Sequence, residues 1–221
     1  MREIILDTET TGLNPSSGDR IVEIGAVELF NHIPTGQTFH VYINPERDMP
    51  AEAEAVHGLS SAFLRDKPTF EVIVADFETF IGDAKLIIHN ASFDMAFINA
   101  ELSYLKRPPI PSGRVVDTLL LARQKHPAGP NSLDALCRRY GVDNSKRTKH
   151  GALLDSELLA EVYLELIGGR QTVFTLAAAT APKPTRVSST LSIQPRQTPL
   201  SSRLTEEERS AHAAFILGLG G

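Results

Sequence analysis

The chain opens with three runs of apolar residues that are separated by short gaps. The runs are "EIILDTE" (3–9), "RIVEIGAVELF" (20–30) and "TFHVYINP" (38–45), and β-branched residues are frequent in them. Runs of this kind, bounded by Asn, Pro and Gly, are typical of strands, and short gaps favour pairing between neighbours. We therefore predict an antiparallel meander of strands, with turns at 14–18 and 31–36.

The pattern then changes to alternating strands and helices. Apolar spacing predicts helices over 69–82, 92–105, 132–141 and 151–169, a buried strand over 85–90, and a strand followed by the start of another helix over 113–124. Ser92 is the expected N-cap of the second helix. This order indicates an α/β fold with a mixed sheet and helices packed on its faces.

The composition changes abruptly after this part. Residues 177–203 are rich in Ala, Ser, Thr and Pro, include no aromatic residue and have no periodic apolar face. Such a segment cannot bury enough apolar surface to offset the entropy that ordering would cost. We therefore divide the chain into a domain over 1–169, a flexible linker over 170–203 and a short terminal segment over 204–221.

The terminal segment has the pattern of a short amphipathic helix. Thr205 and Glu208 have the spacing of a capping box. Four residues follow the roughly helical spacing of one face: Leu204, His212, Phe215 and Ile216. A helix this short is marginal alone in water, so it would gain stability by docking on a partner.

Composition and charge limit the class of protein and the cellular location that we expect. Apolar residues make up 42% of the 221 residues, which supports a real core, and the formal net charge of −5 argues against holding nucleic acid by a strong positive field. A nucleic-acid enzyme with an acidic site stays compatible with this charge. The single cysteine, Cys137, is interpreted as a small buried apolar residue. No stretch is long enough to span a membrane, and we expect a cytoplasmic protein without membrane contact.

Two acids, Asp7 and Glu9, close the first predicted strand. Alternate side chains of a strand share a face, so these carboxylates project together and repel each other unless a cation lies between them. A solvated strand end explains an isolated D-x-E more often than a site does, so a site requires further acids. Asp94 and Asp155 are candidates, although Asp94 could merely complement a helix dipole and Asp155 could be a surface acid. The apolar stripe beside Asp155 places it at a boundary and not squarely on the polar face of its helix.

Three ordered motifs contain these acids. "LDTETTGL", "HNASFD" and "HGALLD" resemble the exonuclease motifs of the DEDD superfamily of 3′-to-5′ exonucleases, and the five-residue step from His150 to Asp155 is that of its histidine-bearing branch. "VHGLS" (56–60), "NSLDALCRRYGVD" (131–143) and the tail are similar to the epsilon proofreading subunits of bacterial DNA polymerase III. The resemblance runs continuously from residue 1 to about 168. Three motifs in the correct order and at the correct spacing are a far more specific signal than any single motif.

The resemblance implies an RNase H-like fold, with a five-stranded mixed sheet flanked by helices. It implies that two divalent cations, Mg²⁺ or Mn²⁺, are bound by Asp7, Glu9, Asp94 and Asp155, with Asp7 bridging them, and that His150 is the general base. The residue types suit this chemistry. Such cations prefer oxygen ligands, and a pair of them neutralises the charge that develops on the attacking and leaving oxygens of a phosphodiester. Histidine can accept a proton near neutral pH.

Substrate contacts are expected beside the metal ligands. Besides Asp7, Glu9 and Asp155, the candidates for binding the 3′-terminal nucleotide are Thr10, Thr11, Gly12, Leu13 and His57. Thr10, Thr11 and Gly12 offer hydroxyls and backbone N–H groups directly after the metal ligands. By the resemblance, Leu13 and His57 flank the terminal base, although a structural role explains Leu13 equally well. A basic loop (146–149) could meet phosphate, but a solvated charged loop is the default interpretation.

The resemblance also implies partners. The substrate would be a DNA 3′ end, and the segment over 204–221 would bind the DNA polymerase III alpha subunit, which keeps the nuclease near the primer end. "GRQTVFTLA" (169–177) weakly resembles a clamp-binding peptide, with Gln171 and Phe174 as contacts to the sliding clamp. Two alternatives stay open: an exoribonuclease of the RNase T or oligoribonuclease type, and a binding module on the same fold. The linker and tail favour the polymerase subunit, and the intact acid set disfavours the binding module.

Overall fold

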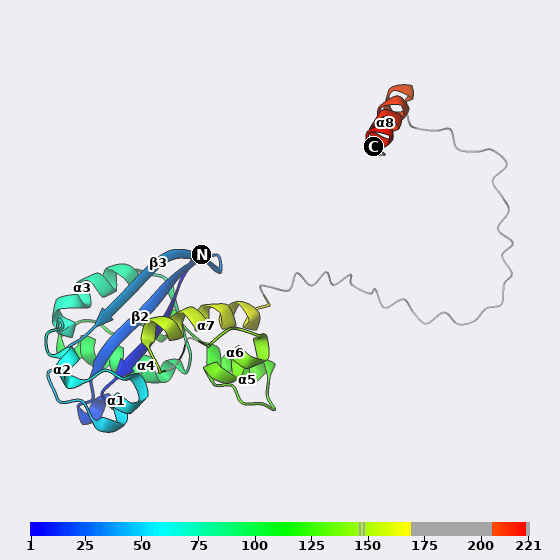
Figure 1. Cartoon of the computed structure of the whole chain (residues 1–221). Helices are drawn as coiled ribbons and strands as arrows, with labels where there is room; N and C mark the ends of the chain where they lie inside the picture. Colours follow the sequence, from blue (N-terminus) through cyan, green and yellow to red (C-terminus); the bar gives the residue numbers. More distant parts are fainter. Residues whose placement is uncertain (146, 148, 169–204, 220–221) are drawn as a thin grey trace, which may run out of the picture. The chain divides into compact units, whose positions relative to one another are not determined.

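The computed structural model describes residues 1–145, 147, 149–168 and 205–219, which fall into two separate units (Figure 1). The first unit holds the described residues up to 168, and the second holds 205–219. Among the described residues, no helix is both long and apolar enough to cross a membrane.

The first unit is built on a five-stranded mixed sheet, as the resemblance implied. Its strands are β1 (Arg2–Thr10), β2 (Ile21–Phe30), β3 (Ile33–Tyr42), β4 (Lys85–Ile88) and β5 (Val115–Asp117), in the order β3-β2-β1-β4-β5. The first three pair antiparallel, which confirms the predicted meander, and β4 and β5 continue the sheet in parallel with β1.

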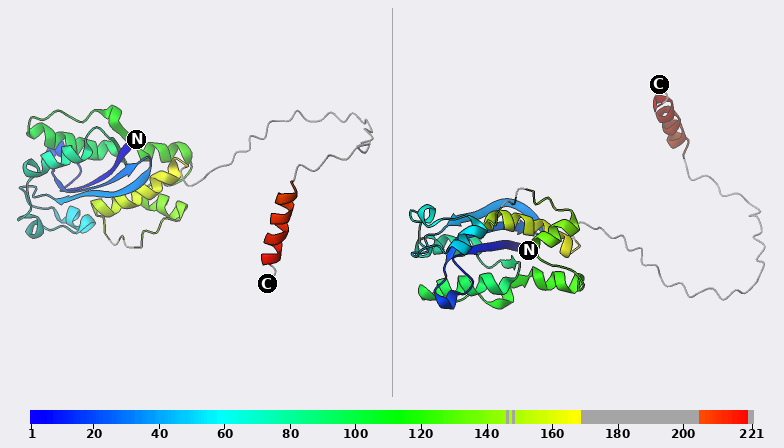
Figure 2. Two further views of the ribbon diagram at one scale, coloured as in Figure 1. Left: turned by 90° about the horizontal axis from the view of Figure 1, so that it is seen from above. Right: turned by 60° about the horizontal axis from the view of Figure 1, so that its bottom comes forward.

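Helices cover both faces of this sheet (Figure 2). They are α1 (Ala51–His57), α2 (Ser61–Leu64), α3 (Phe70–Ile81), α4 (Ala91–Tyr104), α5 (Thr118–Lys125), α6 (Leu133–Tyr140) and α7 (Ala152–Leu166). Helices α3 and α4 contribute to one core cluster, and α5, α6 and α7 contribute to the other. The short helices α1 and α2 were not predicted, because their seven and four residues are too few to show an apolar period.

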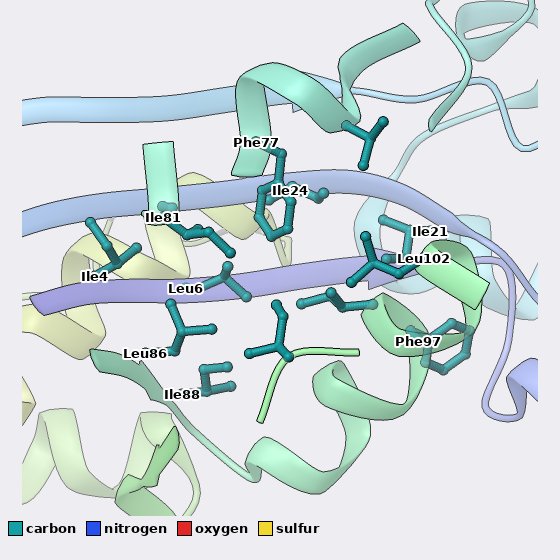
Figure 3. Packing of buried hydrophobic residues seen from close by; sticks show 14 of the residues in the cluster. Ile4, Leu6, Ile21, Ile24, Phe77, Ile81, Leu86, Ile88, Phe97 and Leu102 are labelled. Atoms are coloured by element: carbon teal, nitrogen blue, oxygen red, sulfur yellow. The ribbon is translucent and has the colours of Figure 1, made fainter. Parts of the chain in front are cut away.

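The alternation of side chains along β1 builds both cores. Ile4 and Leu6 are fully buried in the cluster with α3 and α4, as Figure 3 shows around Phe77. Ile5 is buried in the cluster with α7. The same alternation continues at the end of the strand, so Asp7 and Glu9 face the α7 side and Thr8 faces the α4 side. The burial pattern of β1 therefore sets the direction of each chemically active side chain.

Two local predictions were wrong. The N-cap of α4 is Asn90 and not Ser92, because Asn90, two residues after β4, takes a left-handed conformation (φ 61°) and the helix starts at Ala91. The second turn is also shorter than the predicted 31–36. Only Asn31 and His32 form it, both with positive φ, as a two-residue hairpin turn requires. Strand β3 begins directly after them.

The second unit is the helix α8 (Glu206–Leu219). Its predicted capping box is confirmed: Glu208 N–H donates to Thr205 Oγ1 (3.2 Å), and Thr205 N–H donates to Glu208 Oε2 (2.9 Å). Phe215, Ile216 and Leu217 are exposed by 64%, 54% and 82%. The predicted flexible linker and the Gln171–Phe174 motif lie outside the described residues.

Candidate active site

A cavity of about 810 Å³ lies at the carboxyl end of β1. Its lining includes all five residues of the predicted catalytic set: Asp7, Glu9, Asp94, His150 and Asp155. Possible ligand atoms of Glu9, His150 and Asp155 all lie within 4.8 Å of one another. Side chains from β1, from α4, from α7 and from the segment before α7 therefore meet at one place.

Helix α7 reaches this place because of a glycine on β2. Gly25 pairs with Asp7 in the β1–β2 register, and the first turn of α7 packs directly onto it. A Cβ atom on Gly25 would lie 2.1 Å from the backbone nitrogen of Leu153, so no larger residue fits. The Ser156 hydroxyl donates to the Gly25 carbonyl (2.9 Å) and fixes the contact. As a result Asp155, in the same turn, is brought to the β1 acids.

Asp94 comes to the cavity from the opposite face of the sheet. It lies in the first turn of α4 and is only 3% exposed. Its Oδ1 accepts two hydrogen bonds from Thr8, one from the backbone N–H (3.0 Å) and one from the hydroxyl (2.7 Å). The simpler interpretations of both distant acids are therefore wrong: Asp94 does more than complement a helix dipole, and Asp155 is also only 3% exposed.

Burial and mutual repulsion raise the pKa values of three of these acids. Burial is the main cause at Asp7, whose pKa is raised well above its usual value, with Asp94 and Glu9 adding repulsion. The pKa of Glu9 is raised to about 8 by burial and then by Asp155. The pKa of Asp94 is raised to about 7 by burial, although the Thr8 hydrogen bonds act in the other direction. Close carboxylates that resist ionisation together form a site that fits hard divalent cations.

Arg147 binds this acid cluster through its guanidinium group. Its Nε and Nη2 bind both carboxylate oxygens of Asp155, the second at 2.7 Å, and its Nη1 donates to Asp134 (2.8 Å). Nη2 also lies 2.8 Å from His150 Nδ1. The side chain is only 8% exposed, so the expectation of a solvated residue was wrong for Arg147. Lys149 is exposed as expected, and Lys146 lies outside the described residues.

His150 is oriented by these same neighbours. Its Nδ1 lies 3.4 Å from Asp155 Oδ2, and its side chain is 50% exposed at the edge of the cavity. A half-exposed imidazole beside a buried carboxylate can exchange a proton with solvent. The geometry therefore suits a group that accepts a proton inside the cavity and releases it to water.

A second cavity, of about 540 Å³, adjoins the first. Its lining includes the remaining predicted contacts: Thr10, Thr11, Gly12, Leu13 and His57. Leu13 is 85% exposed at this cavity, and burial lowers the pKa of His57. The Thr10 hydroxyl donates to the Gly12 carbonyl (2.6 Å), and the buried Thr11 hydroxyl accepts from Arg20 N–H (3.0 Å). Both hydroxyls thus already serve the loop that forms the cavity wall.

Sequence reasoning missed three residues that organise the site: Thr8, Asp134 and Arg147. Thr8 sits inside the D-x-E motif, but its alternation away from the two acids gave no reason to assign it a role. Arg147 lies in a basic stretch, where a buried guanidinium looks the same as a solvated one. Asp134 is in the first turn of α6, and only the fold places it beside Arg147.

Comparison with known proteins decides the family. The exonuclease family model, RNase T, matches residues 4–163. The DNA polymerase III subunit epsilon of Rickettsia conorii is 52% identical over 219 residues, which cover 98% of this chain and 95% of the relative. That of Escherichia coli K12 is 47% identical over 228 residues, covering 97% and 92%. The chain belongs to the epsilon family of exonucleases.

Solved structures of other exonucleases share the fold of this epsilon-family chain. Exonuclease X in complex with 5′-overhanging duplex DNA superposes with a TM-score of 0.59 at 25% identity, covering 76% of this chain and 92% of that one. The nuclease domain of 3′hExo, a DEDDh family member bound to rAMP, gives 0.66 at 18% identity, with the same coverage of 76% and 92%. The implied RNase H-like fold is thereby confirmed.

Proposed function

We propose that this epsilon-family chain removes nucleotides from the 3′ end of single-stranded or frayed DNA and proofreads for a replicative polymerase. The observation that carries this is the convergence of Asp7, Glu9, Asp94, Asp155 and His150 in one cavity of a chain from an exonuclease family. Relatives near 50% identity over almost the whole chain bear the name of a polymerase subunit, which favours this function over an exoribonuclease.

The acid cluster would hold two divalent cations, Mg²⁺ or Mn²⁺. Bound there, the cations would neutralise the charge that develops on the attacking and leaving oxygens of the phosphodiester. The chain's own part is to aim the carboxylates: Asp7 and Glu9 from β1, Asp94 through Thr8, and Asp155 through the contact of α7 with the sheet. His150 would take the proton of the attacking water and pass it to solvent.

The second cavity would take the terminal nucleotide. Leu13, in the loop after β1, and His57, at the end of α1, line this cavity. They offer an apolar surface and an aromatic ring to a base of any kind. Stacking and van der Waals contacts tolerate every base, because every base has a π-face. An enzyme that removes any mismatched end needs this tolerance, so the apolar wall suits proofreading.

The C-terminal part would tether the enzyme. Helix α8 is capped by Thr205 and Glu208 and exposes Phe215, Ile216 and Leu217, so it has apolar surface to bury against the polymerase alpha subunit. The linker over 170–203 and the clamp contact at Gln171 and Phe174 remain predictions from the sequence. The cytoplasm, where such a polymerase would copy the chromosome, remains the proposed location.

The experiment compares DNA and RNA single strands of the same sequence and length with Mg²⁺ or Mn²⁺ present. We expect much faster degradation of DNA, and faster removal of a mismatched than of a paired 3′ end. The full chain should also bind the alpha subunit in a pull-down. A preference for RNA, or no measurable affinity for alpha, would contradict the proofreading assignment.

A further inference from the structure

Thr8 lies between two metal-ligand candidates on β1 and faces away from them. Asp7 and Glu9 project toward α7, whereas Thr8 projects toward α4 and is 5% exposed. A buried hydroxyl requires a hydrogen-bond partner, and here the partner is Asp94 on α4. Thr8 therefore connects the strand that carries two of the acids to the helix that carries the third.

Both hydrogen-bond donors of Thr8 bind a single oxygen. The backbone N–H donates to Asp94 Oδ1 at 3.0 Å and the hydroxyl donates to the same atom at 2.7 Å. Hydrogen bonds to a charged acceptor are stronger and more directional than neutral ones. With Oδ1 held in this way, the carboxylate cannot rotate freely, and Oδ2 is the oxygen left for another ligand.

The sheet makes this arrangement possible. Strand β4 pairs with β1 only at Glu3, Ile4 and Ile5, so the β1 backbone beyond Ile5 has no β4 partner. The N–H of Thr8 is consequently free to receive a side chain. Helix α4 begins three residues after β4 ends, and its first turn delivers Asp94 to the open edge.

We propose that Thr8 is a positioning residue for Asp94: its hydroxyl fixes the carboxylate so that Oδ2 points at the divalent cation. The proposal rests on the proposed function, since it takes Asp94 as a metal ligand. Groups that orient a metal ligand typically change metal affinity or activity by roughly 10–100-fold when they are removed. Thr8 itself touches no reacting atom in this account.

The substitution Thr8→Val tests the hydroxyl alone. Valine has nearly the shape of threonine and keeps the backbone N–H bond, so only the 2.7 Å hydrogen bond is lost. Thr8→Ser restores a hydroxyl at the same position. Thr79→Val is the matched control, because Thr79 lies exposed on α3 and its hydroxyl donates to the Ala75 carbonyl within its own helix.

The measurement is calorimetric titration of the metal-free full chain with Mn²⁺, together with thermal unfolding in EDTA. We expect Thr8→Val to weaken Mn²⁺ binding by about tenfold or more, Thr8→Ser to recover most of it, and Thr79→Val to match the wild type. A purely structural role would lower the unfolding temperature without changing Mn²⁺ affinity.

Three results distinguish a failure of this proposal from a failure of the proposed function. If the wild type binds Mn²⁺ and Thr8→Val binds it equally well, the positioning role of Thr8 is wrong while the metal site stands. If Thr8→Ser is as defective as Thr8→Val, the hydroxyl is not the cause and the role is also wrong. If the wild type binds no Mn²⁺, the metal site falls and the role of Thr8 falls with it.

Discussion

Removing the Arg147 guanidinium should destabilise the metal-free protein at alkaline pH. Arg147 is the cation that binds both oxygens of Asp155, and the two side chains are 8% and 4% exposed. Its charge also opposes the rise in the pKa values of Asp7 and Glu9. Breaking a buried ion pair from one side costs about 3–5 kcal/mol, because the remaining charge stays buried without a partner. Since Asp134 is 42% exposed, its bond to Arg147 adds little.

We therefore expect Arg147→Met to lose about 3 kcal/mol of unfolding free energy in EDTA at pH 8.5. The loss should shrink at pH 5.5, where Glu9 and Asp94, with pKa values of about 8 and about 7, are protonated and the cluster carries less negative charge. It should also shrink when Mn²⁺ is added, because a bound cation then supplies the missing charge.

The assay is urea unfolding of the full chain followed by circular dichroism. Arg138→Met is the control, because Arg138 is exposed on α6 and should change stability by no more than about 0.5 kcal/mol. A loss below about 1 kcal/mol for Arg147→Met in EDTA at pH 8.5 would refute the reasoning, since it would mean that the ion pair is screened by solvent.

Four further predictions follow from the same geometry. His150→Ala should lower kcat by about 10²–10⁴-fold while Mn²⁺ affinity by calorimetry stays near wild type; near-normal turnover would remove its role as general base. The metal-free protein should lose stability as pH rises from about 4.5 to 8, because the folded state keeps protons on Glu9 and Asp94 that the unfolded state releases. Saturating Mn²⁺ should abolish this pH dependence in urea titrations. A rise in stability over this range would contradict the raised pKa values. Gly25→Ala should lower the free energy of unfolding by more than about 3 kcal/mol in the same assay, because its Cβ would lie 2.1 Å from the Leu153 backbone nitrogen. A loss below about 1 kcal/mol would contradict this packing. Deleting residues 204–221 should leave hydrolysis of free single strands intact and abolish co-purification with the alpha subunit; unchanged co-purification would contradict the tether.

The sequence was sufficient to predict the elements with strong local signals. The three N-terminal strands, the long helices and the α8 capping box are specified by apolar period and by turn or cap residues close in the chain. The acids that line the first cavity were predictable, because the motifs that contain them have a fixed order and spacing. Residue spacing placed Thr8 on the face opposite Asp7 and Glu9, but it could not show that Asp94, 86 positions away in the chain, lies on that face as its hydrogen-bond partner.

The burial of charged side chains could not be predicted from the sequence either. Arg147 looks like any basic loop residue, and its pairing with Asp134 and Asp155 depends on where α6 and α7 begin. The sequence around Gly25 did not show that a glycine is needed there either, because the missing side chain matters only where α7 packs on β2. The N-cap of α4 at Asn90 was missed for two reasons. Ser92 is a residue type that commonly caps helices, and nothing in the sequence pattern showed that Asn90 takes a left-handed conformation.

The central claim is that the clustered acids on β1, α4 and α7 hydrolyse a DNA 3′ end with bound divalent cations. The direct measurement follows a 5′-labelled single strand incubated with the full chain and Mg²⁺ or Mn²⁺, for the wild type and for Asp7→Ala. We predict stepwise shortening from the 3′ end with release of 5′-mononucleotides, abolished by EDTA and by Asp7→Ala. Shortening that persists in Asp7→Ala, or no shortening with either metal, would contradict the account.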